Sequence, residues 1–422
     1  MPSTNSFEFS DWFAMEALRQ LTNPLELGSF FNTSYNSEFK KAYPIGATLH
    51  VPFPKQFLPD NDNTLGYTPQ AIQDRHADVT IDKVGKVHFE WDSIEKALKM
   101  DRGREKIAED IIKPAMTTIR NKIETDCAIW AYQHTPNVVG ILGTNPATFD
   151  AVYGAAGQRL AEISAPAGEH GLFLSPAVIR ALRATVVAQF NPVSDISKMW
   201  RKGLIGEVNG FDTYQSLSLR RHTSAIWAGV VEVTAAVTQS GATPVSTLTL
   251  TCTNGDTFKA GDKFNIVGVN EVNVITKDST GTLKQFSCLT TATIAGTSAT
   301  ITITPPIYGP GSPFQNVDAL PAAGADLTMW PGTAAPTAAH TGTMGLALGE
   351  NAFALCSVPL DNPPQGGSVE ISSQARDPKT GINVAVLRMF DGFQRKWINR
   401  IECIYGFGDF YNDHDSVVIA SA

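Results

Sequence analysis

Two runs near the start of the chain alternate apolar and polar side chains. The first covers residues 48–53, and the second covers residues 79–91, where the alternation breaks once and then resumes. An apolar residue at every second position is typical of a strand with one buried face. A polar loop joins the two runs, so together they predict a hairpin. Because an isolated hairpin is marginally stable in water, we expect it to lie on another surface, in its own domain or in a neighbouring chain.

A helical period follows the second run. Asp92 and Glu95 have the spacing of a capping box, which predicts the start of a helix. Between residues 103 and 134 an apolar stripe recurs every four residues, as in a helix buried on one face. Pro114 lacks a backbone donor and predicts a kink in this helix. Before both runs, residues 10–21 predict a short amphipathic helix in an otherwise irregular segment, which we interpret as an arm.

The middle of the chain alternates helices with short strands. Residues 172–174 predict a strand, and Ser175 and Pro176 predict the cap and first position of the next helix. The stretch RKGLIGEVNGFDTYQS, residues 201–216, places three glycines after a predicted helix and around the start of a strand near Glu207. A phosphate-binding loop has the opposite order, because the N-terminus of the following helix binds the anion. The glycines therefore predict a helix end and a turn.

Charged residues become sparse between residues 223 and 342, where threonine, alanine, glycine and valine dominate. Short strand patterns follow one another in this part, at 247–252, 262–269, 271–275, 285–294 and 298–304. Strands at this spacing, with turn residues between them, predict a small β-barrel or sandwich.

The mixed pattern returns after the threonine-rich part. Residues 353–360 predict a strand, and residues 382–407 predict a long hairpin with an Asp391-Gly392 turn. The chain therefore predicts an α+β fold into which a β-module is inserted.

Composition restricts the classes of function. The chain has 422 residues and a formal net charge of -8, which argues against nucleic-acid binding driven by neutralisation of phosphates. Its first residues lack the basic start and apolar core of a signal peptide, and its apolar stretches are too short to span a membrane. Five scattered cysteines without a CxxC pair predict buried thiols in a reducing compartment.

The sequence predicts no catalytic residue, no cofactor site and no metal site. The stretch DNDNTLG, residues 60–66, differs from a calcium loop in the position of its glycine and lacks the final glutamate. The stretch NDHD, residues 412–415, contains metal-ligand types, but we interpret it as a solvated acidic tail. The histidines are dispersed, and no nucleophile-elbow motif is present.

The order of these parts resembles the major capsid (coat) protein of tailed bacteriophages, in the podovirus-type version with an inserted β-barrel domain. The stretches that carry the resemblance are HVPFPKQF, VHFEWDSIEKALK, GLIGEVNGFDTYQS, TLTLTCTNGDTFKAGDKF with TITPPIYG, and AFALCSVPL. The implied fold class is α+β, with an N-arm, an extended hairpin loop, a spine helix, and axial and peripheral domains. The implied bounds are 1–47 for the N-arm, 48–91 for the extended loop, 92–136 and 376–422 for the peripheral domain with the spine helix, 137–221 and 343–375 for the axial domain, and 222–342 for the inserted β-barrel domain.

The resemblance also implies a function in self-assembly. Subunits of the family form pentamers and hexamers of an icosahedral shell, and the extended loop of each lies over the adjacent subunit. The shell encloses double-stranded DNA without sequence-specific binding. Its other implied partners are a scaffolding protein, with which it forms a procapsid that expands on packaging, and a portal protein. Assembly is expected in the cytoplasm of the bacterial host, without a membrane, a cofactor or an enzymatic activity.

Candidate contact residues follow from the same resemblance. In relatives a basic helix-turn-helix of the scaffolding protein docks on an acidic N-arm, which makes Asp11 and Glu16 candidates here; ordinary surface acids are the alternative. In relatives a charged loop of the inserted domain bridges capsomers, but the corresponding stretch here, residues 234–246, is uncharged. Lys277, Asp278 and Lys284, on another predicted loop, are therefore the candidate inter-capsomer residues.

Three other classes of protein stay open from the sequence. A bacterial nanocompartment shell shares the fold and differs in its cargo, although the large β insertion argues against it. A phage tail or receptor-binding protein is built from β-modules, and the long helix argues against that class. An enzyme of unrecognised class would need a concave pocket with convergent polar groups.

Overall fold

The computed structural model describes residues 26–34, 48–58, 72–92, 112–166, 168–189, 207–239, 243–360, 369–376, 382–393 and 396–422, together with Met15, Ala17 and Gln70. The chain divides into two compact units. The first consists of residues 1–51, 77–127 and 353–410, and the second of residues 52–76, 128–352 and 411–422.

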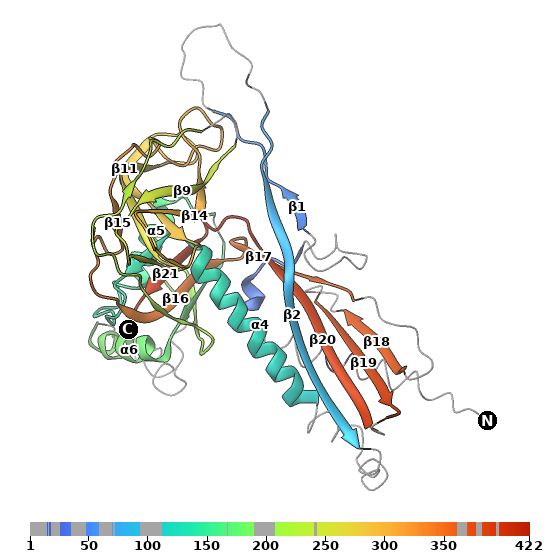
Figure 1. The fold of residues 1–422 in the computed structure, drawn as a ribbon. Helices are drawn as coiled ribbons and strands as arrows, with labels where there is room; N and C mark the ends of the chain where they lie inside the picture. Colours follow the sequence, from blue (N-terminus) through green and yellow to red (C-terminus); the bar gives the residue numbers. More distant parts are fainter. Residues whose placement is uncertain are drawn as a thin grey trace, which may run out of the picture. The chain divides into compact units, whose positions relative to one another are not determined.

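The first unit contains a six-stranded sheet. The strands in order are β1 (Thr48–Pro52), β2 (His76–Asp92), β20 (Lys396–Asp409), β19 (Asn383–Asp391) and β18 (Val369–Arg376), and β17 (Phe353–Val358) also pairs with β20. Strands β2 and β20 run antiparallel side by side from Val79, opposite Gly408, to Asp92, opposite Lys396 (Figure 1). Both predicted strands of the first hairpin are confirmed, and the second pairs with β1 on one side and with β20 on the other, within its own unit. The hairpin with the Asp391-Gly392 turn is confirmed as β19 and β20.

Helix α4 (Lys113–His134) carries the predicted apolar stripe. Its part in the first unit buries Ala115, Met116, Ile119, Ile123 and Cys127. The hydroxyl of Tyr405 in β20 donates a hydrogen bond to Asp126 at 2.7 Å, which joins the helix to the sheet. Pro114 is the second residue of the described helix, where a missing N–H is tolerated. Residues 93–111 fall outside the described residues, so the kink stays a prediction; Asp92, the predicted cap, ends β2.

A short part of the arm, residues 26–34, packs against helix α4 and strand β17 within the first unit. Around the 3-10 turn η1 (Gly28–Phe30), the carboxylate of Glu124 accepts hydrogen bonds from the N–H groups of Glu26 (2.8 Å) and Leu27 (3.1 Å). The ring of Phe31 stacks on Phe353 with centroids 5.5 Å apart. Of the predicted helix at 10–21, the structure describes Met15 and Ala17 alone, both helical.

The second unit contains a seven-stranded mixed sheet. Its strands in order are β3 (Val138–Gly140), β21 (Ser416–Ala420), β16 (Thr341–Gly349), β4 (His170–Leu174), β6 (Phe211–Gln215) and β5 (Glu207–Val208), and β7 (Arg221–Thr223) pairs with the start of β16. Helices α5 (Tyr153–Glu162) and α6 (Pro176–Gln189) pack on this sheet. One buried cluster contains Leu160 of α5, Leu182 of α6, Leu172 of β4 and Ile419 of β21. The Oγ of Ser175 accepts a hydrogen bond from the N–H of Val178 at 3.4 Å, which confirms the predicted N-cap of α6.

The glycine-rich stretch at 201–216 ends in a β-hairpin. Asn209 and Gly210 have φ angles of 53° and 77° and join β5 to β6. Positive φ at both central residues is the signature of a tight hairpin turn, for which Asn-Gly is the preferred pair. The predicted strand near Glu207 is therefore interrupted after two residues, and the last glycine serves this turn. The predicted helix before the stretch lies outside the described residues.

The threonine-rich part of the second unit forms a closed barrel. The sheet order is β15 (Leu327–Met329), β11 (Lys263–Val272), β12 (Ser279–Cys288), β14 (Ser298–Ile307), β9 (Val245–Thr251) and β8 (Glu232–Val233), and the short pair β10 (Thr257–Phe258) and β13 (Ala292–Thr293) lies beside it. The ends of the sheet meet, because Glu232 bridges to Asp326 and the N–H of Leu327 donates to the carbonyl of Val231 at 2.8 Å. Of the two predicted alternatives, the structure thus shows a barrel.

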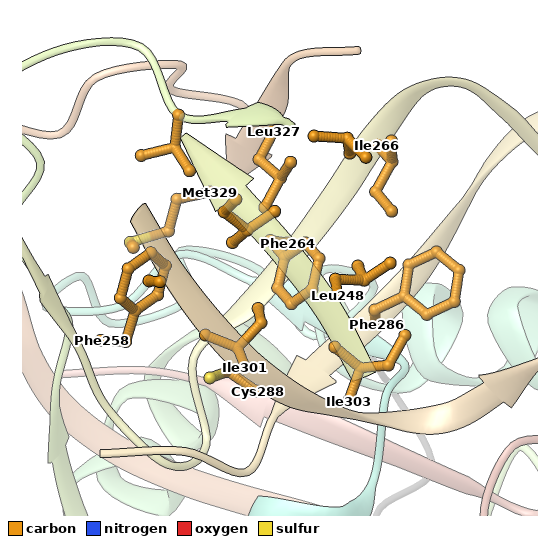
Figure 2. Close-up of a cluster of buried hydrophobic side chains, with 14 of the residues drawn as sticks. Leu248, Phe258, Phe264, Ile266, Phe286, Cys288, Ile301, Ile303, Leu327 and Met329 are labelled. Carbon is orange, nitrogen blue, oxygen red and sulfur yellow. The ribbon is translucent and has the colours of Figure 1, made fainter. Parts of the chain in front are cut away.

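The interior of the barrel is a single apolar cluster. Figure 2 shows Leu248, Phe264, Ile301 and Leu327 directed into it from four different strands. The two strands predicted at 262–269 and 271–275 are wrong as separate elements. They form one strand, β11, whose register shifts near Asn270, and the residues after Val272 turn toward β12.

We predict that Gly406 tolerates no side chain, because β2 lies directly against it. A Cβ at this position would lie 2.6 Å from the Cα of Ile81. Gly406→Ala should therefore destabilise the subunit by about 1–3 kcal/mol, the usual cost of overpacking. Chemical unfolding followed by circular dichroism measures the effect.

The matched control is Gly392→Ala, because a Cβ there would meet no atom within 4 Å. This variant should stay within about 0.5 kcal/mol of wild type. Equal losses in the two variants would contradict the packing explanation.

Candidate functional site

The structure describes three of the five predicted contact residues. Asp11 and Glu16 lie outside the described residues. Lys277, Asp278 and Lys284 belong to the β11–β12 hairpin of the barrel, which makes this hairpin the candidate site.

The tip of the hairpin is held by its own backbone. The N–H of Lys277 donates to the carbonyl of Asn273, and the N–H of Asn273 donates to the carbonyl of Asp278, both at 2.9 Å. Lys277 adopts a left-handed conformation, with φ of 61°. The side chains of Ile275 and Asp278 are exposed at this tip. The hairpin therefore presents one apolar and one acidic side chain on an ordered turn.

Lys277 is only half exposed, because its ammonium faces the subunit. Its Nζ lies 3.4 Å from the carbonyl oxygen of Gln315. Burial, with a smaller effect from the charge of Arg75, lowers the pKa of Lys277 below its ordinary value. This lysine and Asp278 are together at the tip as expected, and their role between capsomers stays a prediction.

Lys284 does not lie on a loop, so the sequence-based placement is wrong. It is the sixth residue of β12 and is 1% exposed. Its Nζ lies 2.8 Å from Oε1 of Glu271 in β11. A lysine enclosed in this way has its partner within the subunit and offers no charge to a neighbour. In the sequence TLKQFSC it stands in phase with the buried Phe286 and Cys288, which is the signal that indicates an inward side chain.

Arg159 of α5 completes a buried triad with Glu271 and Lys284. Its Nη1 lies 2.9 Å from Oε2 of Glu271, in an alignment that makes an ion pair but not a hydrogen bond. Its Nη2 donates to Oδ1 of Asn137 at 2.9 Å. Burial acts to raise the pKa of the Glu271 carboxyl, but Lys284 and Arg159 outweigh burial and hold that pKa below its ordinary value. The triad joins the barrel to the mixed sheet through charges.

Lys263 makes a second link, to the C-terminal end of α4. Its Nζ donates to the carbonyls of Tyr132 (2.6 Å) and Thr135 (2.5 Å) and to Oγ of Ser287 (2.8 Å). Burial lowers the pKa of Lys263 to about 7, and the nearby Asp262 acts in the opposite direction. The last carbonyls of a helix have no partner within the helix, and here a lysine from the barrel supplies one.

The NDHD stretch is buried, so its interpretation as a solvated tail is wrong. Asn412, Asp413 and Asp415 are each less than 5% exposed. Asn412 donates to the carbonyl of His134 at 2.8 Å, and Asp415 lies 3.1 Å from Nε2 of His170. These contacts use the polar side chains to fix the start of β21, which sequence charge alone does not indicate.

All five cysteines are buried free thiols, as predicted. Burial raises the pKa of Cys288, Cys356 and Cys403 to about 12 and that of Cys252 to about 11. A thiol that stays protonated is a poor nucleophile, so these residues act as apolar packing.

We predict that the buried triad tolerates the loss of all its charges better than the loss of one. Glu271→Gln should cost about 3–5 kcal/mol, because it leaves the buried Lys284 without an anion and Arg159 with only the half-exposed Glu162. The triple variant Arg159→Met, Glu271→Leu and Lys284→Met should fall close to wild type. Urea unfolding of purified subunits measures each free energy.

Glu232→Gln is the matched control, because this glutamate is exposed on β8 and should have little effect. A Glu271→Gln variant as stable as this control would show that the triad carries no net stability.

We predict that His170 contributes stability below neutral pH. Its hydrogen bond to Asp415 raises the pKa of His170 above the ordinary value of 6.5. The contribution is therefore full below pH 6.5 and is lost as the pH rises through the raised pKa. His170→Gln should lose more stability at pH 6 than at pH 8.5, whereas the exposed His340→Gln should show no such difference. A loss for His170→Gln that is independent of pH would contradict this prediction.

None of the helices in the described part of the chain has both the length and the apolar character needed to cross a bilayer.

Comparisons with known proteins address the family directly. The family model described as P22 coat protein - gene protein 5 matches residues 79–411. A search of curated proteins returns no significant match. Among solved structures, a chain from Mycobacterium phage Che8 is similar at 12% identity, with a TM-score of 0.48, over 94% of this chain and 90% of that chain. A chain from the capsid of Ralstonia phage GP4 is similar at 9% identity, with a TM-score of 0.43, over 95% and 92%. The CUS-3 coat protein I-domain is similar at 29% identity, with a TM-score of 0.19, over 24% of this chain and 96% of that one.

The family model covers most of the chain, from β2 through β20. The chain therefore belongs to the P22 coat protein family: it is a bacteriophage coat protein, a structural protein and not an enzyme.

Proposed function

We propose that this protein is the major capsid protein of a tailed bacteriophage and assembles into the pentamers and hexamers of an icosahedral shell around double-stranded DNA. The match of the coat-protein family model over residues 79–411 carries the proposal. The net charge of -8 agrees with a shell that confines its genome without binding it through basic patches.

The proposed domain organisation follows the order of the elements. Residues 222–342 form the inserted barrel domain, residues 48–91 the extended loop, and residues 1–47 the N-arm. The closed barrel with its own apolar cluster supports the assignment of an inserted domain. One subunit makes several contacts at once in a closed shell, so each contact can be weak and the shell still stable.

The proposed partners are a scaffolding protein, a portal protein and further copies of the chain. Asp11 and Glu16 are the proposed scaffold contacts on the arm. The exposed Asp278, with Lys277 beside it, is the proposed contact between capsomers. Assembly takes place in the host cytoplasm, through a procapsid that expands when DNA enters.

We predict that the purified protein forms closed shells of uniform size when a scaffolding protein of the same phage is present. Electron microscopy of the protein with and without that scaffold measures this. A monomer or trimer under all conditions would contradict the proposed function. Shells that form alone and contain a host protein would favour a nanocompartment instead.

The same assay tests the arm contacts. Replacement of Asp11 and Glu16 by lysine should abolish scaffold-dependent assembly, because it reverses the charge that a basic partner meets. Unchanged co-assembly of this variant would remove the arm assignment and leave the coat function standing.

A further inference from the structure

The two arms of the extended loop meet in a ladder of contacts at its base. The N–H of Phe53 donates to the carbonyl of Arg75 at 2.9 Å. Lys55 and Asp74 form an ion pair. Farther out, the side-chain amide of Gln70 both donates to the carbonyl of Leu58 and accepts from its N–H, each at 2.9 Å. We call residues 52–58, Gln70 and residues 72–76 the stem, since these contacts hold the two arms together.

Arg75 connects the stem to the barrel. Its guanidinium carbon lies 4.6 Å from the ring centre of Phe53 on the opposite arm, 5.4 Å from that of Tyr308 and 5.9 Å from that of Phe314. A guanidinium within about 6 Å of an aromatic ring is attracted by the electrons of its face. One cation therefore contacts three rings, one from the stem and two from the segment that follows β14.

Other contacts hold Tyr308 and Phe314 in the positions that Arg75 meets. Tyr308 and Phe314 are each 5% exposed and pack on one another with centroids 5.9 Å apart. The side chain of Asn316 holds their segment in place, by accepting from the N–H of Tyr308 at 2.9 Å and donating to the carbonyl of Pro306 at 2.8 Å. Phe53 also meets the edge of Tyr411 at 5.5 Å. The segment that receives Arg75 is thus also held by contacts that do not involve Arg75.

Charge complementarity supports the same arrangement. The charge of Arg75 contributes, with His414 and Lys284, to lowering the pKa of the buried Asp413 against the effect of burial. Arg75 is half-buried, so a neutral or smaller side chain would lose both the ring contacts and this attraction. Lysine keeps the charge but not the flat guanidinium that stacks on rings.

We infer that Arg75 is a positioning residue that locks the stem of the extended loop to the inserted barrel, so that the barrel sets the direction in which the loop reaches a neighbouring subunit. The second half of this inference rests on the proposed capsid function, and the first half does not. The barrel then has a role in assembly through the loop it holds, in addition to any contact of its own.

The first test is hydrogen exchange of the unassembled subunit. Arg75→Gln should increase the exchange of amides in residues 52–58 and 72–76 by about threefold to thirtyfold, as expected for loss of a cation–π contact. Exchange in β11 and β14 should stay as in wild type. Arg75→Lys should give an intermediate result, and the exposed Arg221→Gln is the control for loss of an arginine. Unchanged exchange at the stem in Arg75→Gln would overturn the lock.

The second test is assembly with scaffold, observed by electron microscopy. Arg75→Gln should give aberrant or fewer shells, while Arg221→Gln gives wild-type shells. Normal shells from a variant with a loosened stem would overturn the role in assembly and leave the lock standing. If wild type itself forms no shell, the capsid proposal fails, and the exchange result still decides whether Arg75 holds the stem.

Discussion

The C-terminal end of helix α4 is the point at which three separate segments of the second unit are joined by hydrogen bonds. Its last carbonyls receive hydrogen bonds from three side chains that are distant in sequence: Lys263 binds at Tyr132 and Thr135, Ser287 at Gln133, and Asn412 at His134. An ammonium group has three donors and no acceptor, so Lys263 is fully used by the three acceptors around it. A cation at a helix C-terminus also meets the negative end of the helix dipole. The barrel, the helix end and the C-terminal strand are thus joined through one set of backbone groups.

The other lysines of the barrel also have their hydrogen-bond acceptors within the chain. Residues 222–342 contain four lysines and no arginine. Each of the four donates a hydrogen bond within the subunit, Lys259 and Lys277 to backbone carbonyls, Lys263 to the helix end and Lys284 to Glu271. A buried charge is costly unless it is paired. The two buried lysines therefore help to hold the barrel in place, Lys263 directly on the end of α4 and Lys284 through Glu271 and Arg159 of α5. Lys263 and Lys284 therefore offer no charge to a partner, whereas the half-exposed Lys277 stands beside Asp278 in the proposed contact between capsomers.

The sequence predicted the elements whose period is strong and local, and failed where partners are far apart. The alternation in β2 and β19, the stripe of α4 and the Ser175 cap depend on neighbours along the chain, and all were predicted correctly. Lys263 and Thr135 are 128 positions apart, and nothing local distinguishes this lysine from a surface one. The predicted loop position of Lys284 is wrong, although its phase with Phe286 indicates an inward side chain. The Asn209-Gly210 turn was missed although the pair itself is a hairpin signal.

The internal use of cations changes how contacts between subunits are best explained. A salt bridge between capsomers needs an exposed charged side chain, which the barrel offers in the acidic Asp278 rather than in its lysines, because each lysine donates a hydrogen bond within the subunit. The barrel also exposes hydroxyl-rich strand surface, where Thr249 on β9 lies opposite Thr300 on β14, and the apolar Ile275 at the hairpin tip. Neutral surfaces of this kind bind by fit and by number of contacts, so the placement of each element matters more than its charge. A fixed barrel and a fixed loop stem meet that requirement, because Lys263 and Arg75 hold them through contacts within the subunit.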